Sequence, residues 1–247
     1  SNRWQGARMI EQSGDFQVVV NPSNAPLSEA ETDAAFDLPF TRYPHPRYNK
    51  RGQIPAFEMI RNSINLHRGC FGGCAFCAIS AHQGKFVVSR SETSIMKEVN
   101  DIAADPGFKG HITDMGGPSA NMYRMKGIDT EKCKKCSRAS CIFPTICRNL
   151  NTDHRPMTAL YKKAMQVKGV KRITIGSGIR YDLLAGRTVA EDKLWGLDEY
   201  LQQVIRHHVS GRLKVAPEHS SQHVLQIMRK PHYRTFNDFK KRFDEIN

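Results

Sequence analysis

The hydrophobic residues change their spacing along the chain, from short runs typical of strands to stripes typical of helices. Apolar runs predict strands over residues 63–67, 110–117, 171–178 and 212–217. Apolar residues three or four positions apart predict helices over residues 92–105, 157–168, 191–209, 220–230 and 235–247. Strands that alternate with helices imply right-handed crossovers and a mainly parallel sheet, so we expect an α/β fold, either doubly wound or curved toward a barrel.

Three of the predicted helices carry stripes of residues at helical spacing, which predict core positions. The stripe of the helix at 92–105 consists of Ile95, Met96, Val99, Ile102 and Ala103. The helix at 191–209 is the clearest, with Leu194, Leu197, Leu201, Val204, Ile205 and His208 at helical spacing. The last helix carries Phe236, Phe239, Phe243 and Ile246, which we interpret as core residues.

The chain divides by composition near residue 60. Residues 1–60 contain one strand candidate at 16–23 and a turn-rich stretch at 38–57, which predicts an irregular N-terminal arm packed on the rest. Residues 61–247 hold four strand units, fewer than a closed eight-stranded barrel needs. A cysteine-rich stretch at about 127–150 lies between a predicted strand and the next helix, so we expect an insertion there.

Composition excludes several classes of protein. With 39% hydrophobic and 25% charged residues the chain is in the range of ordinary globular proteins, and no run approaches the ~20 apolar residues of a membrane span. The first ten residues lack the apolar segment of a secretory signal. Seven cysteines in two short segments do not resemble a secreted disulfide framework, so we expect a cytoplasmic protein whose thiols bind metal.

The net charge is +13, from 37 Lys and Arg against 24 Asp and Glu, which makes an anionic partner such as RNA one candidate. Cysteines that bind metal do so as thiolates, so occupied sites would lower this charge. One interpretation of the chain is therefore a metal-stabilised RNA-binding module without catalysis.

The first cysteine group is Cys70, Cys74 and Cys77, within the sequence RGCFGGCAFC. Gly72 and Gly73 let the backbone bend closely around a ligand. An iron-sulfur cage usually takes four cysteines and structural zinc takes four Cys or His ligands, so three cysteines leave the fourth place to be filled.

This loop and several longer stretches resemble one enzyme family. The spacing C-x3-C-x2-C with an aromatic residue before the last cysteine, together with TRYPHPRY, DMGGPSANMY, GSGIRYDL and LKVAPEHSSQHVLQIMRKP, is similar to the YgiQ-type radical SAM (S-adenosylmethionine) family. The resemblance covers most of residues 15–247 and implies an open, partial (β/α) barrel of the radical SAM type. It also implies that the chain is an enzyme.

The resemblance implies the cofactors as well. A [4Fe-4S] cluster on Cys70, Cys74 and Cys77 would reductively cleave S-adenosylmethionine, and the resulting 5'-deoxyadenosyl radical would abstract hydrogen from an unknown substrate. An external reductant such as flavodoxin or ferredoxin is then a partner. The last stretch also resembles the corresponding turn in methylthiotransferases, so RNA or protein modification is a candidate reaction.

Further residues are assigned through the same resemblance. Phe76 would pack near the adenine, and Gly116 and Gly117 would let backbone carbonyls meet the methionine amino group. Pro118 stands where the superfamily usually has an acidic residue, so Asp114 or Ser119 would have to take its place.

Two strand ends supply the remaining candidates for cofactor binding. Ser177 and Arg180 follow one strand, and the Arg180 guanidinium is expected either to bind the methionine carboxylate or to form a surface ion pair with Asp182. Glu218 ends another predicted strand and is expected to face the reaction chamber.

The second cysteine group is Cys133, Cys136, Cys141 and Cys147, with the spacing C-x2-C-x4-C-x5-C. Four thiols suit a closed site, and both zinc and an auxiliary iron-sulfur cluster fit that number. Disulfides are the remaining alternative. The chain begins with SN and ends on a helix, so we also expect it to be a segment of a longer protein.

Overall fold

The strands of the computed structural model, which describes residues 2–247, are short and form four pairs. The parallel pairs are β3 (Ser63–Asn65) with β7 (Asp114–Gly116) and β6 (His111–Ile112) with β8 (Arg172–Ile173). The antiparallel pairs are β1 (Met9–Ser13) with β2 (Phe16–Val20) and β4 (His67–Arg68) with β5 (Val88–Ser89).

Backbone hydrogen bonds between the pairs join the two parallel ones into one twisted layer. The Met115 amide donates to the Thr174 carbonyl at 3.2 Å, and the Thr174 amide donates to the Ile112 carbonyl at 3.0 Å. The strands ending near residues 65, 116 and 175 therefore run side by side in one direction. A mixed α/β fold with this parallel pairing confirms the predicted class, whereas no closed barrel is present over residues 2–247. A partial barrel stays a prediction.

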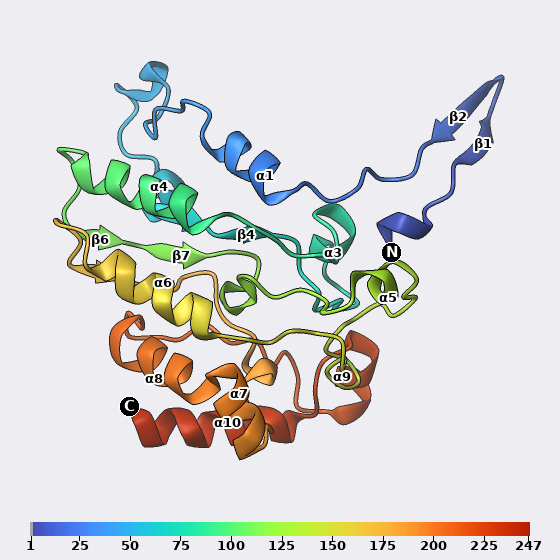
Figure 1. Cartoon of the computed structure of the whole chain (residues 1–247). Coiled ribbons are helices and arrows are strands. Elements are labelled where there is room, and N and C mark those ends of the chain that lie inside the picture. Colours follow the sequence, from blue (N-terminus) through green and yellow to red (C-terminus); the bar gives the residue numbers. More distant parts are fainter. Residues whose placement is uncertain (1) are drawn as a thin grey trace.

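The four longest helices pack around this layer (Figure 1). They are α4 (Glu92–Ala104), α6 (Arg155–Met165), α8 (Leu197–His207) and α10 (Tyr233–Ile246). The shorter ones are α1 (Glu29–Phe36), α2 (Pro55–Ile60), α3 (Ile79–His82), α5 (Thr130–Lys134), α7 (Val189–Trp195) and α9 (Gln222–Met228). Single 3-10 turns are η1 (Arg3–Gln5), η2 (Pro46–Tyr48), η3 (Ala120–Met122) and η4 (Tyr181–Leu183).

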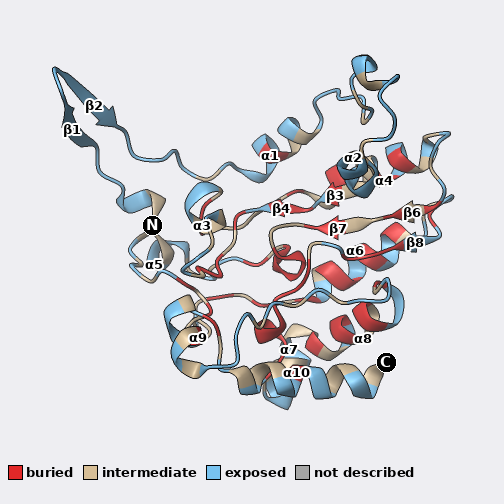
Figure 2. Ribbon diagram, turned by 180° about the vertical axis from the view of Figure 1, so that it is seen from behind, coloured by how far each residue is buried: buried red, intermediate tan, exposed pale blue. Residues whose placement is uncertain are grey.

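The core lies where the predicted helical stripes meet the strands (Figure 2). Ile95, Val99 and Ile102 of α4 are almost completely buried, and Phe239 of α10 is buried with its apolar neighbours packed against the same core. Burial of such side chains stabilises the fold by roughly 1.5–3 kcal/mol each. The stripes predicted at 92–105 and 235–247 are confirmed.

Two predictions from periodicity are wrong. The predicted helix at 191–209 is two helices, because Gly196 adopts a left-handed conformation (φ 61°) between α7 and α8. This break turns α7 away from the core, and Leu194 is 55% exposed. Residues 212–217, predicted as a strand, do not form one. The segment lies beside the turn after β8, where the Lys214 carbonyl accepts a hydrogen bond from the Ile179 amide at 3.1 Å.

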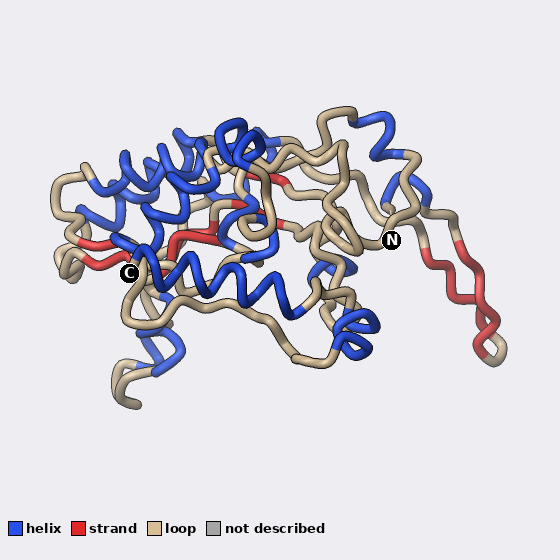
Figure 3. The backbone as a smooth tube through the Cα atoms, turned by 90° about the horizontal axis from the view of Figure 1, so that it is seen from below, coloured by secondary structure: helices blue, strands red, loops and turns tan. Residues whose placement is uncertain are grey.

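The first 60 residues contain more regular structure than the sequence indicated. The strand predicted at 16–23 is β2, but β1 pairs with it, and the hairpin projects from the molecule (Figures 1 and 3). Helix α1 begins with a capping box between Ser28 and Glu31 and contacts α4 through the Asp33 carboxylate, which accepts from the Ser91 amide at 2.9 Å. The division into arm and core stays a prediction.

No helix among residues 2–247 has the length and apolar character that crossing a membrane would need.

Candidate functional site

The first cysteine loop leaves β4 and is held from both sides. The Cys70 amide donates to the Gly84 carbonyl at 3.0 Å. The end of α9 lies against the loop, because the Ala75 amide donates to the Met228 carbonyl at 3.1 Å and Arg229 Nη1 to the Gly73 carbonyl at 3.2 Å. Cys70, Cys74 and Cys77 are half-buried free thiols on this fixed turn.

The Arg180 side chain reaches this loop from the turn after β8. Its Nη1 lies 3.2 Å from Cys74 Sγ, while Nε and Nη2 donate to the two carboxylate oxygens of Asp182 at 2.8 and 2.5 Å. Asn121 holds the Arg180 backbone by accepting from its amide at 2.7 Å and donating to its carbonyl at 3.0 Å. The ion pair with Asp182 thus exists, but it is buried and adjoins a cysteine, so the expectation of a surface pair is wrong.

The electrostatics of this loop are set by burial and by one buried cation, Arg180. Burial raises the pKa of Cys70, while the Gly72 amide and the Arg180 cation act to lower it. Burial by itself lowers the pKa of Arg180, but the charge of Asp182 and contact with Cys74 raise it overall. Arg180 therefore remains a cation beside the thiols.

Three other predicted residues, Asp114, Gly116 and Ser177, meet where β7 adjoins the turn after β8. Asp114 Oδ1 accepts from the Gly176 amide at 2.8 Å, the Ser177 amide at 3.0 Å and Ser177 Oγ at 3.1 Å. Gly116 packs against Ser177 so closely that a Cβ at residue 116 would collide with the hydroxyl. Asp114 thus fixes the turn that carries Ser177, a role that the sequence did not indicate.

His67, which the sequence reasoning missed, supports the adjoining turn. Its ring is buried, and its Nε2 lies 3.0 Å from the Ser119 carbonyl. A Cβ on Gly117 would lie 2.7 Å from the same nitrogen. Burial lowers the pKa of His67 to about 4, so the ring is neutral at pH 7. The only sequence feature that could have pointed to this role of His67 was its position in the strand before the cysteine loop.

Phe76 and Glu218 lie at the edge of this region. Phe76 is 55% exposed, so its ring is available to a ligand. Glu218 has a left-handed backbone (φ 69°), and its Oε1 lies 3.5 Å from the Nζ of the buried Lys230. Their roles toward a cofactor stay predictions.

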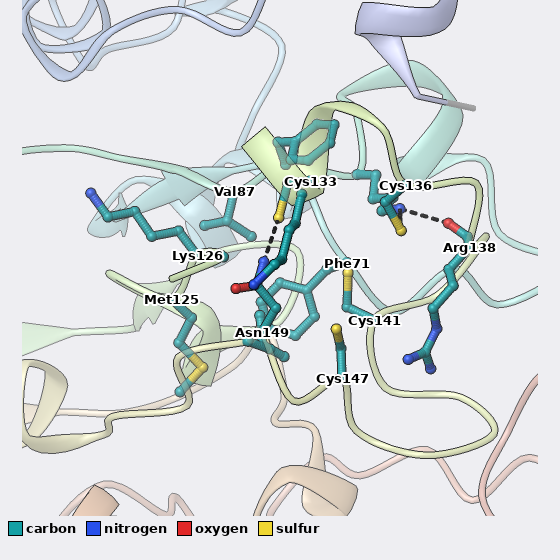
Figure 4. Close-up of a pocket in the computed structure, with 15 residues that line it drawn as sticks. Phe71, Val87, Met125, Lys126, Cys133, Cys136, Arg138, Cys141, Cys147 and Asn149 are labelled. Carbon is teal, nitrogen blue, oxygen red and sulfur yellow. Dashed lines mark hydrogen bonds between the residues drawn. The ribbon is translucent and has the colours of Figure 1, made fainter. Parts of the chain in front are cut away.

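The second cysteine group surrounds a cavity of about 250 Å³ (Figure 4). All four of its cysteines line the cavity, which the structure closes with apolar side chains and a few polar ones, among them Phe71, Lys85, Val87, Met125, Arg138, Asn149 and Leu150. Burial raises the pKa of Cys141 to about 11 and also raises that of Cys133. The structure therefore brings together the four thiols that the spacing predicted.

The two cysteine groups adjoin each other. The Cys141 amide donates to the Phe71 carbonyl at 3.0 Å, and the buried Phe71 ring lines the second cavity. Gly73 has a left-handed backbone (φ 61°), and a Cβ there would collide with the Ala139 carbonyl. The first loop and the insertion therefore share a packed boundary.

The spacing of the thiols bears on the kind of metal. Within residues 2–247 all seven cysteines are free, and no three Cys, His, Asp or Glu side chains converge closely enough to hold one metal ion. A zinc ion binds each sulfur at ~2.3 Å, so it draws four sulfurs close together. A cube-shaped cluster binds each thiolate at a different corner and needs wider spacing with space between. Which metal each group binds stays a prediction.

Comparisons with known proteins identify the family. A family model described as the radical SAM N-terminal region matches residues 1–63. A UPF0313 protein of Bacteroides thetaiotaomicron is 54% identical over 247 residues, which is 100% of this chain and 40% of that protein. A UPF0313 protein of Vibrio vulnificus is 44% identical over 248 residues, again 100% of this chain and 31% of the relative. The chain belongs to the YgiQ-type radical SAM family.

Membership of the YgiQ-type family confirms the resemblance found in the sequence. The chain spans less than half the length of the curated relatives it matches. The matched model ends in β3, before the cysteine loop begins. The reaction and the ligands of the individual cysteines are therefore inferred from the site geometry.

Proposed function

We propose that this chain carries the catalytic core of a radical S-adenosylmethionine enzyme, with a [4Fe-4S] cluster held by Cys70, Cys74 and Cys77. The observation that carries the proposal is the set of three half-buried free thiols on one fixed turn, with Arg180 Nη1 3.2 Å from Cys74 Sγ. The family supports the same assignment. When bound, the cluster supplies one electron to S-adenosylmethionine, whose cleavage starts hydrogen abstraction from the substrate.

The chain's own residues bind and orient these groups. Arg180 and the Gly72 amide, which lies 3.4 Å from Cys70 Sγ, offset the negative charge of the thiolates. Gly72 must remain small, because a Cβ there would lie 2.9 Å from Arg180 Nη1. Arg180 is already bound to Asp182, so we assign it to the thiolates in preference to the methionine carboxylate.

The strand ends shape the place for S-adenosylmethionine. Asp114 fixes Ser177, and His67 fixes the turn at Ser119, so the backbone at Gly116 and Gly117 is packed between these two supports. The exposed Phe76 ring is available to stack on adenine. An external reductant such as flavodoxin or ferredoxin supplies the electron, and the substrate, with nucleic acid as one candidate, is not identified by these residues.

Anaerobic reconstitution with iron and sulfide tests the proposal. The reduced protein should convert S-adenosylmethionine to methionine and 5'-deoxyadenosine, measured by chromatography. Cys74→Ala should lose this conversion, whereas Ala78→Ser, an exposed neighbour outside the ligand set, should retain it. Wild-type protein that holds zinc and no iron and leaves S-adenosylmethionine intact would instead favour the non-catalytic RNA-binding module.

A further inference from the structure

The cavity between α5 and the first cysteine loop has the shape and chemistry of a second metal centre. Its four cysteines come from a stretch of fifteen residues, and their sulfur atoms lie around one common space (Figure 4). The cavity has about 250 Å³ of free space, although the walls are mostly apolar and could have packed together. The space among the thiols therefore leaves room for an occupant.

Two polar side chains approach the sulfurs as partners for negative charge. Asn149 Nδ2 lies 3.2 Å from Cys133 Sγ, and Lys85 Nζ lies 3.8 Å from Cys136 Sγ. Lys85 is 4% exposed and donates to the Arg138 carbonyl at 2.6 Å. No carboxylate in residues 2–247 pairs with Lys85.

A buried ammonium without a carboxylate partner is costly unless an anion lies beside it. Neutral thiols or disulfides do not supply that charge. Four thiolates around iron and sulfide do, because each thiolate adds one negative charge that the metal only partly neutralises. Lys85 therefore favours a metal-thiolate centre over disulfides.

The arrangement favours a cluster over zinc. The four thiols line a space of about 250 Å³, whereas a zinc ion bound ~2.3 Å from each sulfur needs far less room. We propose that Cys133, Cys136, Cys141 and Cys147 hold an auxiliary iron-sulfur cluster in this cavity, with Lys85 and Asn149 as its charge and hydrogen-bond partners. Phe71 of the first cysteine loop lines the cavity, and its carbonyl accepts a hydrogen bond from the Cys141 amide. This site does not depend on the proposed function.

The decisive test removes the first site and counts iron. In the variant Cys70→Ala/Cys74→Ala/Cys77→Ala, anaerobic reconstitution should leave about four irons per chain, with a paramagnetic signal on reduction. Adding Cys136→Ser should remove this iron. Adding Ser137→Ala, at the exposed neighbouring residue, should keep it. About one zinc and no iron, or four thiols that remain open to alkylation after reconstitution, would overturn the inference.

A second measurement covers the event that the triple variant does not fold. Wild-type protein should hold about eight irons and Cys136→Ser about four. Cleavage of S-adenosylmethionine by wild type with only about four irons, all lost in Cys74→Ala, would refute the auxiliary cluster and leave the proposed function standing. Iron retained in the triple variant, together with a wild type that leaves S-adenosylmethionine intact, would refute the proposed function alone.

Lys85→Met separates charge compensation from cavity filling. The methionine keeps the apolar stem but removes the ammonium beside Cys136. We expect the auxiliary cluster to be lost several-fold faster under a chelator, while Lys132→Met, at an exposed lysine lining the same cavity, should not change that rate. Equal rates in both variants would remove Lys85 from the site.

Discussion

The two cysteine regions differ most in how their cations are paired. At the first, Arg180 contacts Cys74 but already binds Asp182 with two hydrogen bonds. At the second, Lys85 is buried beside Cys136, with the Arg138 carbonyl and the Phe86 ring as its other partners. The first region is therefore close to neutral before any metal binds, whereas the second is left with an uncompensated positive charge. We therefore expect the stability of the second region to depend more on a bound metal centre than that of the first.

The regions are also less separable than the sequence suggested. Phe71 belongs to the first loop, yet it packs in a small core with Met125, Ile142 and Leu150 around the second group. Loosening of the insertion at 127–150 would therefore remove part of the support of the first loop. The predictions below use this contrast and this shared wall.

Loss of a ligand should have the largest effect and should differ between the regions. Cys74→Ala should abolish formation of 5'-deoxyadenosine, because the first cluster has no spare ligand. Cys136→Ser should lose the second centre and make the insertion sensitive to protease, since the segment is polar and short. Chromatography measures 5'-deoxyadenosine, and limited proteolysis with iron analysis measures the loss of the second centre. A Cys136→Ser protein that is as protease-resistant as wild type and keeps all its metal would contradict the prediction for the second region.

The cation comparison predicts stability effects of different size in metal-free protein. Arg180→Leu strands the buried Asp182 carboxylate and should destabilise the fold by about 3–5 kcal/mol. Lys85→Met strands no carboxylate and removes a buried charge, so it should change stability by less than about 1 kcal/mol. Urea unfolding measures both. Arg180→Leu/Asp182→Leu should recover much of the loss, and failure to recover would show that packing, not charge, is responsible.

Acid should loosen the first region before the second. Burial lowers the pKa of His67 from 6.5 to about 4, so the unfolded state binds more protons than the folded state between these values. The contribution of neutral His67 to the free energy of unfolding is therefore fully present above about pH 6.5. It falls as the pH drops toward about 4, by about 3 kcal/mol at most.

Hydrogen exchange at pH 7 and pH 4.5 locates this effect. The Leu66 amide, bonded to Gly116, should lose more protection than the Ile128 amide, bonded to Asn149. His67→Gln should flatten the pH dependence, and His223→Gln, at an exposed histidine, should not. Equal loss at both amides would mean that His67 does not distinguish the regions.

The smallest expected effects come from two glycines, one in each region. Gly117→Ala places a Cβ 2.7 Å from His67 Nε2, and Gly127→Ala places one against Cys133 Sγ. Overpacking of this kind costs about 1–3 kcal/mol. Gly117→Ala should weaken S-adenosylmethionine binding by about 10-fold, or roughly 1.4 kcal/mol, and leave the iron content unchanged. Gly127→Ala should lower the iron content of the second site. Calorimetry measures S-adenosylmethionine binding and metal analysis measures the iron. Loss of iron in Gly117→Ala, or weaker S-adenosylmethionine binding in Gly127→Ala alone, would contradict the assignment of the two glycines.

The helices were predictable where a stripe of apolar residues repeats locally. Helices α4, α9 and α10 begin and end within a few residues of their predicted bounds. The failures have physical causes. Gly196 ends one helix inside a continuous stripe, β1 is exposed on both faces, and α1 depends on a capping box in place of an apolar face.

The sequence by itself determined which cysteines group together, because ligand number and spacing are properties of adjacent residues. It also determined the alternation of strands and helices that makes the fold α/β. Only the tertiary structure decided that Arg180 Nη1 lies beside Cys74, that Lys85 faces Cys136, and that Phe71 of the first loop lines the second cavity. Such pairs lie far apart along the chain, and only the packing of distant elements brings them together.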